Sequence, residues 1–219
     1  MQEKDVIILF DLDGTLIDST DAIVGCFLHS FDELGFDFKG DIEDIKNEIG
    51  YPLDIMYETL GVPEERIEDF VNSYKQEYRL VSEEKTTLLT GALEAVKLAA
   101  SFARIGIVTT KTTLYTLPLL TNFEILEYFE TIIGRQEVTN PKPHPEPILK
   151  AMERMNVDET NDIYMIGDTK LDLIAANEAS VNGVGVLCGY GKKDDLLQYT
   201  DTVYKDALQA VEGIHKKHQ

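Results

Sequence analysis

The chain has 219 residues, and its 40 Asp and Glu outnumber its 20 Lys and Arg, which gives a formal net charge of −20 at pH 7. Such acidity argues against nucleic-acid and membrane partners, because phosphate backbones and anionic bilayers attract clustered Lys and Arg. The chain is 43% apolar, and its apolar residues recur periodically, which is typical of a globular protein and argues against disorder.

The chain has two cysteines, Cys26 and Cys188, which lie far apart and without neighbouring ligand residues. They cannot form a disulfide framework or a CxxC metal site. The apolar run VIILF at 6–10 is too short for a signal sequence or a membrane span. We therefore expect a cytoplasmic location.

Short apolar runs rich in β-branched residues alternate with helical patterns along most of the chain. The helical patterns include one face with Leu93, Val96 and Ala100, and another with Ile148, Leu149, Met152 and Met155. Strands that alternate with helices indicate right-handed βαβ units and a parallel sheet in an α/β fold. The predicted strands are 6–10, 105–108, 131–133, 163–166, 184–187 and 203–204.

The segment between the first two predicted strands has a different pattern. It shows no convincing strand, only helical repeats such as Ile23, Cys26, Phe27, Phe31 and Leu34. A helical block of roughly seventy residues is too long for an ordinary βαβ crossover. We therefore predict an inserted helical domain at 16–88, and a core domain formed by 1–15 and 89–219.

Polar side chains gather where the predicted strands end. Ligands bind beyond the carboxyl ends of the strands in an open parallel sheet, so we expect these side chains to meet in one crevice. Four strand ends contribute to it. They carry Asp11, Asp13 and Thr15, then Thr109, Thr110 and Lys111, then the segment NPKPHP with Lys142, and finally Asp168 and Asp172.

These residue types favour phosphoryl chemistry. Four carboxylates cannot share a dry crevice without a cation, and Asp oxygens suit Mg²⁺, which bridges carboxylates to phosphate oxygens. Lys142, and Thr109 with its neighbouring amides, would offset charge on the phosphoryl oxygens. One carboxylate can attack phosphorus, while a second can protonate the leaving alkoxide and then deprotonate water. Alternation along an extended segment places Asp11 and Asp13 on the same side, as this division needs.

The order of these motifs resembles that of the haloacid dehalogenase superfamily of phosphohydrolases. The matching segments are DLDGTLIDS at 11–19, the strand that ends at Thr109, the Lys142-Pro143 pair and GDTKLD at 167–172. The resemblance covers nearly the whole chain and implies a Rossmann-like core with a helical cap inserted after the first motif. Within the superfamily, IGIVTTK, NPKPHPEPIL and MIGDTKLDLIAANEAS are similar to segments of phosphoglycolate phosphatases and their relatives.

The resemblance implies a role for each matched residue. Asp11 corresponds to the nucleophile, and Asp13 to the general acid and base. Thr109, Thr110 and Lys142 correspond to the phosphate-binding positions, and Thr110 stands where the phosphoglycolate phosphatase subgroup often has Asn. A Mg²⁺-dependent phosphatase with an aspartyl-phosphate intermediate is therefore expected.

The resemblance also implies the metal site and the substrate. Asp168 corresponds to a Mg²⁺ ligand, and Asp172 supports that site directly or through water. Asp11 and the backbone carbonyl of Asp13 would complete the coordination. The expected substrate is a small phosphorylated metabolite, 2-phosphoglycolate first, whose leaving group would be read by the cap and by residues 189–191.

Other functions share much of this pattern. An inorganic pyrophosphatase, a nucleotidase, a sugar phosphomutase resembling β-phosphoglucomutase, and a non-catalytic sensor remain alternatives, whereas Asp13 argues against a dehalogenase. Tyr51 and Lys46 are candidate substrate contacts or ordinary surface residues. His144 is interpreted as shaping its loop, and His29 as an ordinary residue on the polar face of a helix. The pattern does not set the oligomeric state.

Overall fold

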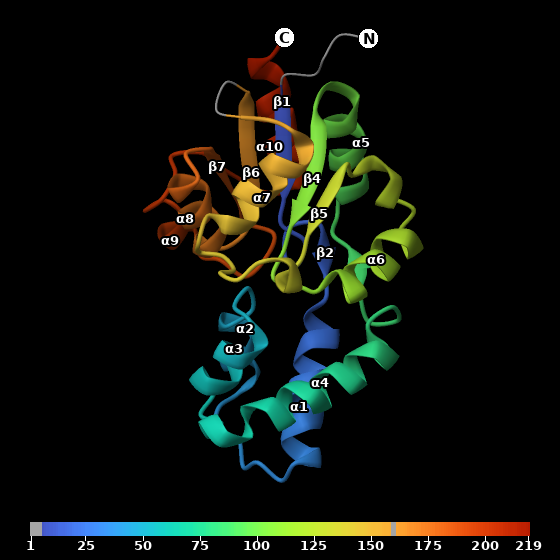
Figure 1. Cartoon of the computed structure of the whole chain (residues 1–219), viewed down its shortest axis with the longest axis vertical. Helices are drawn as coiled ribbons and strands as arrows, with labels where there is room; N and C mark the ends of the chain where they lie inside the picture. Colours follow the sequence, from blue (N-terminus) through green and yellow to red (C-terminus); the bar gives the residue numbers. More distant parts are fainter. Residues whose placement is uncertain (1–5, 159–160) are drawn as a thin grey trace. The chain divides into compact units, whose positions relative to one another are not determined.

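The computed structural model describes residues 6–158 and 161–219 (Figure 1). The chain divides into two compact units, one formed by Met1–Asp18 and Leu88–Gln219 and the other by Ser19–Thr87. The inserted segment expected from the sequence, 16–88, spans the second unit. Among the described residues, no helix combines the length and apolar character needed to cross a membrane.

The first unit is built on a six-stranded parallel sheet with the order β5-β4-β1-β6-β7-β8. All six predicted strands are present, which confirms the α/β fold. Because every strand runs the same way, the carboxyl ends of all six strands lie along one edge of the sheet. The strands are β1 (Val6–Phe10), β4 (Arg104–Val108), β5 (Thr131–Ile133), β6 (Asp162–Gly167), β7 (Asn182–Val186) and β8 (Val203–Tyr204).

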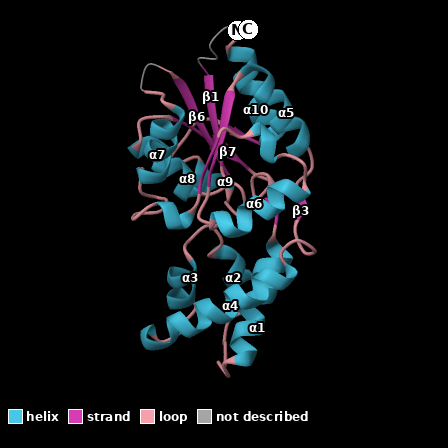
Figure 2. Cartoon of the chain, turned by 45° about the vertical axis from the view of Figure 1, so that its right-hand side comes forward, coloured by secondary structure: helices cyan, strands magenta, loops and turns pink. Residues whose placement is uncertain are grey.

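Helices cover both faces of this sheet (Figure 2). Ile8 and Phe10 of β1 pack in the core on the side of α5 and α10, whereas Ile7 and Leu9 pack on the side of α7 and α8. This alternation follows the two-residue period of a strand, and it explains why every residue of β1 is buried. The helices of this unit are α5 (Ala92–Phe102), α6 (Thr113–Asn122), α7 (Glu146–Met155), α8 (Lys170–Glu178), α9 (Lys193–Leu196) and α10 (Ala207–Lys217). Two short 3₁₀ helices complete it, η2 (Leu126–Tyr128) and η3 (Arg135–Glu137).

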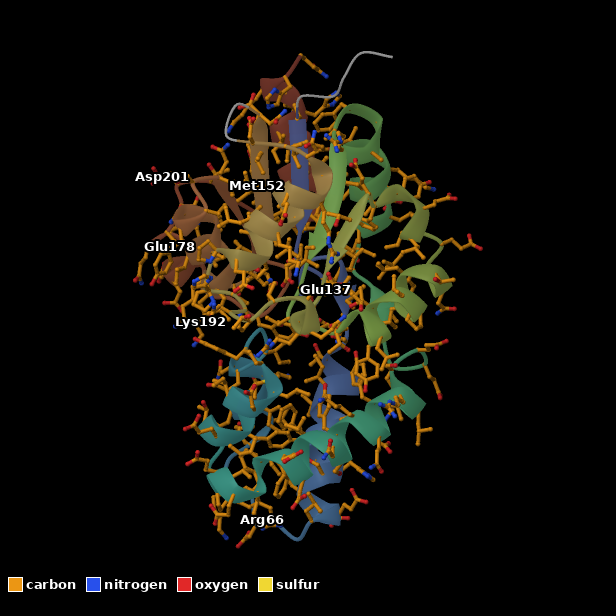
Figure 3. All side chains as sticks on the ribbon, in the orientation of Figure 1. Arg66, Glu137, Met152, Glu178, Lys192 and Asp201 are labelled. Carbon is orange, nitrogen blue, oxygen red and sulfur yellow. The ribbon has the colours of Figure 1, made fainter. Side chains whose placement is uncertain are left out.

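One predicted core residue of α7 is wrong. Ile148 and Met155 are buried as expected, and Met152, labelled in Figure 3, is partly buried against the same core. Leu149 is instead 47% exposed. The position next to Ile148 lies about 100° further around the helix, so Leu149 leaves the face that meets the sheet.

The second unit is helical and has an aromatic core. Phe27 contacts Tyr57 at 4.5 Å and Tyr74 at 5.2 Å between ring centroids. The hydroxyl of Tyr57 lies 2.7 Å from that of Ser30, which satisfies a polar group inside this core. Cys26, which precedes Phe27 in the chain, is fully buried. The helices are α1 (Thr20–Glu33), α2 (Ile42–Asn47), α3 (Leu53–Thr59), the 3₁₀ helix η1 (Glu64–Arg66) and α4 (Ile67–Val81).

Two short strands were missed by the sequence analysis, which predicted no strand between the first strand and residue 88. β2 (Ile17–Asp18) and β3 (Thr87–Leu88) form a separate two-stranded sheet. Each strand has two residues, which is too short for an alternating apolar pattern to show.

Candidate active site

Asp11 is the first residue after β1, and its backbone continues the sheet. Its amide donates a hydrogen bond of 2.8 Å to the carbonyl of Ile166, and the residue is 5% exposed. Burial raises the pKa of Asp11 to about 7; the nearby Lys142 ammonium opposes the rise, and the Asp172 carboxylate adds to it. A buried strand end therefore presents a carboxylate whose charge depends on its neighbours.

Lys142 supplies the positive charge at this carboxylate. Its Nζ lies 2.8 Å from Oδ1 of Asp11 and 2.5 Å from Oδ1 of Asp172, and it donates a 3.1 Å hydrogen bond to the carbonyl of Val108. Burial alone would lower the pKa of Lys142, but the two carboxylates outweigh it and raise the pKa above its usual range. Lys142 is therefore a buried cation.

Asp168 follows β6 and is fully buried. The hydroxyl of Thr15 donates to its Oδ1 at 3.0 Å, and the amide of Tyr190 donates to its Oδ2 at 2.8 Å. Burial raises the pKa of Asp168, and the carboxylates of Asp11 and Asp172 raise it further. Neither Thr15 nor Tyr190 was assigned this contact from the sequence.

Two glycines make room for Asp168. Gly14 has a φ of +81°, and a Cβ there would lie 2.4 Å from Oδ2 of Asp168. A Cβ on Gly189 would lie 2.1 Å from the same oxygen. The loop 189–191, interpreted from the sequence as reading the leaving group, thus packs directly against this carboxylate.

Asp172 is oriented by the start of α8. It is the third residue of the helix, and its Oδ2 accepts hydrogen bonds from the Thr169 amide at 3.0 Å and the Thr169 hydroxyl at 2.8 Å. This is a capping box, in which the N-cap residue and the third helical residue satisfy each other's polar groups. The other oxygen, Oδ1, remains directed at Lys142.

Asp11, Asp168 and Asp172 form a group that could hold a metal ion. One carboxylate oxygen from each lies within 4.8 Å of the others, and all three residues are buried. The donors are hard carboxylate oxygens, and burial together with their mutual repulsion raises the pKa of Asp11 and Asp168. Both properties fit a small divalent cation such as Mg²⁺.

Asp13 has a lysine partner of its own. Nζ of Lys111 lies 3.1 Å from Oδ1 of Asp13, and the two side chains are 8% and 12% exposed. Lys111 was noted at the strand end but given no role. Asp13 is close enough to Asp11 to raise the pKa of that carboxyl slightly.

The two predicted phosphate-binding threonines follow β4. The Thr109 amide donates to the Ile133 carbonyl at 2.9 Å, while its Oγ1 accepts a 3.1 Å hydrogen bond from the Lys111 amide. Thr109 is 4% exposed, and Thr110 is partly buried beside it. Both therefore lie at the same edge of the sheet as the carboxylates.

The remaining candidates have local contacts. His144 is exposed, and its Nδ1 accepts a hydrogen bond from the Glu146 amide. His29 lies on the exposed side of α1, 3.7 Å from Glu33. Lys46 pairs with Glu43 at 2.8 Å on α2.

The parallel sheet and the carboxylate–lysine cluster at its carboxyl edge define a protein of the α/β class with a buried acidic site that could hold a metal ion. The chain belongs to the haloacid dehalogenase-like hydrolase family, whose sequence pattern matches residues 8–186. Phosphoglycolate phosphatase of Escherichia coli (strain K12) is 31% identical, in an alignment that covers 97% of this chain and 94% of that protein.

Two further comparisons agree with this assignment. A Dickeya dadantii protein named "Probable phosphatase IndB" is 30% identical over 94% of this chain and 92% of its own length. A haloacid dehalogenase-like family hydrolase from Streptococcus pneumoniae has a solved structure with a TM-score of 0.86 and 28% identity, covering 97% of this chain and all of that one. The chain is thus a phosphatase, a phosphoric monoester hydrolase.

Proposed function

We propose that this phosphatase hydrolyses a small phosphomonoester through an aspartyl-phosphate on Asp11, with Mg²⁺ as cofactor. The observation that carries the proposal is the contact of one buried lysine, Lys142, with Asp11 and Asp172, beside the carboxylate of Asp168. A cation at this point can neutralise a phosphoryl group as it reaches the nucleophile.

In the first half-reaction, a carboxylate oxygen of Asp11 forms a bond to phosphorus while the bond from phosphorus to the ester oxygen breaks. Asp13, in its protonated form, gives its proton to the departing alkoxide, which leaves as an alcohol. Asp13 ends this step as a carboxylate, beside Lys111, which offsets its charge. Phosphate is then held as a mixed anhydride on Asp11.

In the second half-reaction, water attacks phosphorus. The Asp13 carboxylate takes a proton from that water, so it returns to its protonated form. The bond from phosphorus to Asp11 breaks, the Asp11 carboxylate is restored, and inorganic phosphate departs. Atoms and charge balance over the two steps, and the same residue serves first as acid and then as base.

The surrounding residues bind and orient the phosphoryl group. We assign this role to Lys142, to the Thr109 hydroxyl and to the backbone amide of Thr110. All three lie at the carboxyl edge of the sheet. Asp11, Asp168 and the backbone carbonyl of Asp13 would hold the ion. Mg²⁺, when bound, would neutralise the phosphoryl oxygens and orient the group for in-line attack.

Asp172 is better suited to orient Lys142 than to ligate a metal directly. Its Oδ1 faces the Lys142 ammonium, which would repel a metal ion there, and its Oδ2 already accepts two hydrogen bonds from Thr169. Its contribution to the metal site would then run through a bound water.

The likeness to phosphoglycolate phosphatase supports 2-phosphoglycolate as the first substrate to test. We assign the segment 16–88 as the family's helical cap. A cytoplasmic location belongs to the same proposal, because two cysteines far apart in the chain do not make the disulfide framework of a secreted domain.

Phosphate release from a substrate panel, with Mg²⁺ or with EDTA, tests the proposal. The panel holds 2-phosphoglycolate, pyrophosphate, nucleoside monophosphates, hexose phosphates and an aryl phosphate. Mg²⁺-dependent release with a preference for 2-phosphoglycolate is expected. Equal release in EDTA would contradict the cofactor, and a preference for pyrophosphate or a nucleotide would contradict the substrate.

A further inference from the structure

We propose that Glu146 is a positioning residue for Lys142, which it serves by fixing the loop that carries this lysine. The inference rests on the proposed function, because it assumes that Lys142 binds the phosphoryl group. Glu146 is the first residue of α7, and it lies four residues after Lys142 in the chain.

The loop has few backbone donors with which to define its own shape. Four of the nine residues 139–147 are prolines, which leaves five backbone N–H groups. Regular secondary structure therefore cannot hold the part of this segment that precedes α7, and its conformation depends on other acceptors.

Glu146 accepts hydrogen bonds from two of those five donors. Its Oε1 accepts from the Thr139 amide at 2.8 Å, and its Oε2 accepts from the Asn140 amide at 2.8 Å. The Asn140 side-chain amide adds a third hydrogen bond, of 2.9 Å, to Oε2. One carboxylate thus ties the start of the loop to the start of α7, with Lys142 between them.

Further contacts close the same loop. The His144 amide donates to the Pro141 carbonyl at 3.0 Å, and the Glu146 amide donates to Nδ1 of His144 at 3.1 Å. On the preceding side, Nζ of Lys150 in α7 donates to the carbonyl of Glu137, which is labelled in Figure 3. The loop is therefore anchored to α7 at both ends.

The charge of Glu146 matches this role. The backbone amides of Thr139 and Asn140 hold its pKa below its usual range, so that the residue is a carboxylate and accepts at both oxygens. A glutamine at 146 keeps the size of the side chain, but its NH₂ group would face an N–H donor. The substitution therefore breaks at least one of the two backbone contacts.

The position of Lys142 is demanding, because its Nζ contacts Asp11, Asp172 and the Val108 carbonyl together. A shift of the loop would move the ammonium away from the phosphoryl site. A misplacement of about 1 Å can cost about 100-fold in rate. We expect Glu146→Gln to weaken binding of inorganic phosphate, in the presence of Mg²⁺, by about tenfold or more.

The test combines Glu146→Gln with Lys142→Ala in a double-mutant cycle, with phosphate affinity read by calorimetry on the full chain. Glu153→Gln is the matched control, because Glu153 is an exposed glutamate of the same helix. The inference predicts that Glu146→Gln weakens binding in the wild-type background but adds nothing in the Lys142→Ala background. The Glu153→Gln variant should bind phosphate as the wild type does.

Three outcomes would overturn the inference. Glu146→Gln could bind like Glu153→Gln, or weaken binding by the same factor in both backgrounds, or lower thermal stability without changing phosphate affinity. Full affinity and turnover in Lys142→Ala would instead contradict the proposed role of Lys142, and with it this inference. If Glu146→Gln does not fold, Glu146→Asp takes its place in the cycle, because it keeps the charge but shortens the side chain. If Lys142→Ala binds phosphate too weakly to measure, Lys142→Arg takes its place.

Discussion

Nζ of Lys111 lies 3.1 Å from Oδ1 of Asp13, and neither side chain is more than 12% exposed. Lys142 makes the corresponding contact with Asp11, 2.8 Å away. Each aspartate of the Asp-x-Asp motif therefore has its own largely buried lysine, one from the end of β4 and one from the loop before α7. This pairing lets two carboxylates of different proposed function lie close together in a poorly solvated site.

The Lys111–Asp13 pair predicts a stability effect. Lys111→Met leaves the Asp13 charge without this lysine, and breaking a buried pair from one side costs about 3 kcal/mol in the free energy of unfolding. Lys193→Met, at an exposed position of α9, should change it by less than about 0.5 kcal/mol.

Urea denaturation measures both changes. The Lys111→Met, Asp13→Asn double variant should be more stable than Lys111→Met alone, because it leaves no unpaired carboxylate. Equal midpoints for Lys111→Met and Lys193→Met would show that the ion pair adds nothing to stability.

Asp13→Asn should separate substrates by their leaving groups. If Asp13 protonates the departing alkoxide, the variant loses activity on an alkyl phosphate by about 100-fold or more. An aryl phosphate, whose leaving group needs less protonation, should lose much less. Steady-state kcat on the two substrates provides the comparison. A similar loss on both would argue against the acid role.

The stability of the metal-free protein should depend on pH. The pKa of Asp11 is raised from 3.8 to about 7 in the folded chain, so folding favours the protonated form. The stabilisation linked to Asp11 is complete below the pKa that this group has in the unfolded chain. It is lost as the pH rises through the folded-state pKa of about 7. In EDTA, the urea midpoint should therefore be lower at pH 8 than at pH 6.

Mg²⁺ should raise the midpoint at pH 8, because it binds the ionised carboxylates of the folded state. The urea midpoint of Asp11→Asn should depend less on pH in EDTA. This variant therefore distinguishes the titration of Asp11 from that of the four histidines of the chain. An unchanged midpoint between pH 6 and pH 8 for the metal-free wild type would show that burial does not raise the pKa of Asp11 as described.

Gly189→Ala should damage the site without unfolding the chain. The added methyl would lie 2.1 Å from Oδ2 of Asp168 and 2.5 Å from the Gly14 carbonyl, so both must move. We expect Mg²⁺-dependent turnover to fall by about tenfold or more. Gly25→Ala in α1 is the control, since a Cβ there would lie 3.7 Å from the flexible end of the Lys85 side chain, an ordinary contact distance.

The Gly25→Ala variant should keep full activity and gain up to about 1 kcal/mol of stability, because alanine suits a helix interior better than glycine. Phosphate release and thermal unfolding distinguish the two variants. Full turnover in Gly189→Ala would mean that the position of Asp168 is not critical.

The sequence predicted the six strands and the meeting of Asp11, Lys142, Asp168 and Asp172. Both follow from simple regularities: buried parallel strands are continuous apolar runs, and their carboxyl ends share one edge of the sheet. The contacts of Thr15 and Tyr190 with Asp168 could not be predicted this way. They depend on the paths of two loops, and the Thr15 contact spans 153 residues of sequence.

The most direct test of the central claim is chemical trapping of the phosphorylated aspartate. The enzyme is mixed with 2-phosphoglycolate and Mg²⁺, quenched during turnover, treated with borohydride, and digested for mass spectrometry. Reduction of an aspartyl-phosphate yields homoserine, which we expect at position 11 in the wild type and not in Asp11→Asn, whose turnover should also fall by at least about 1000-fold. Asp194→Asn, an exposed position on α9, should behave as the wild type. Homoserine at another position, or wild-type turnover in Asp11→Asn, would contradict the account.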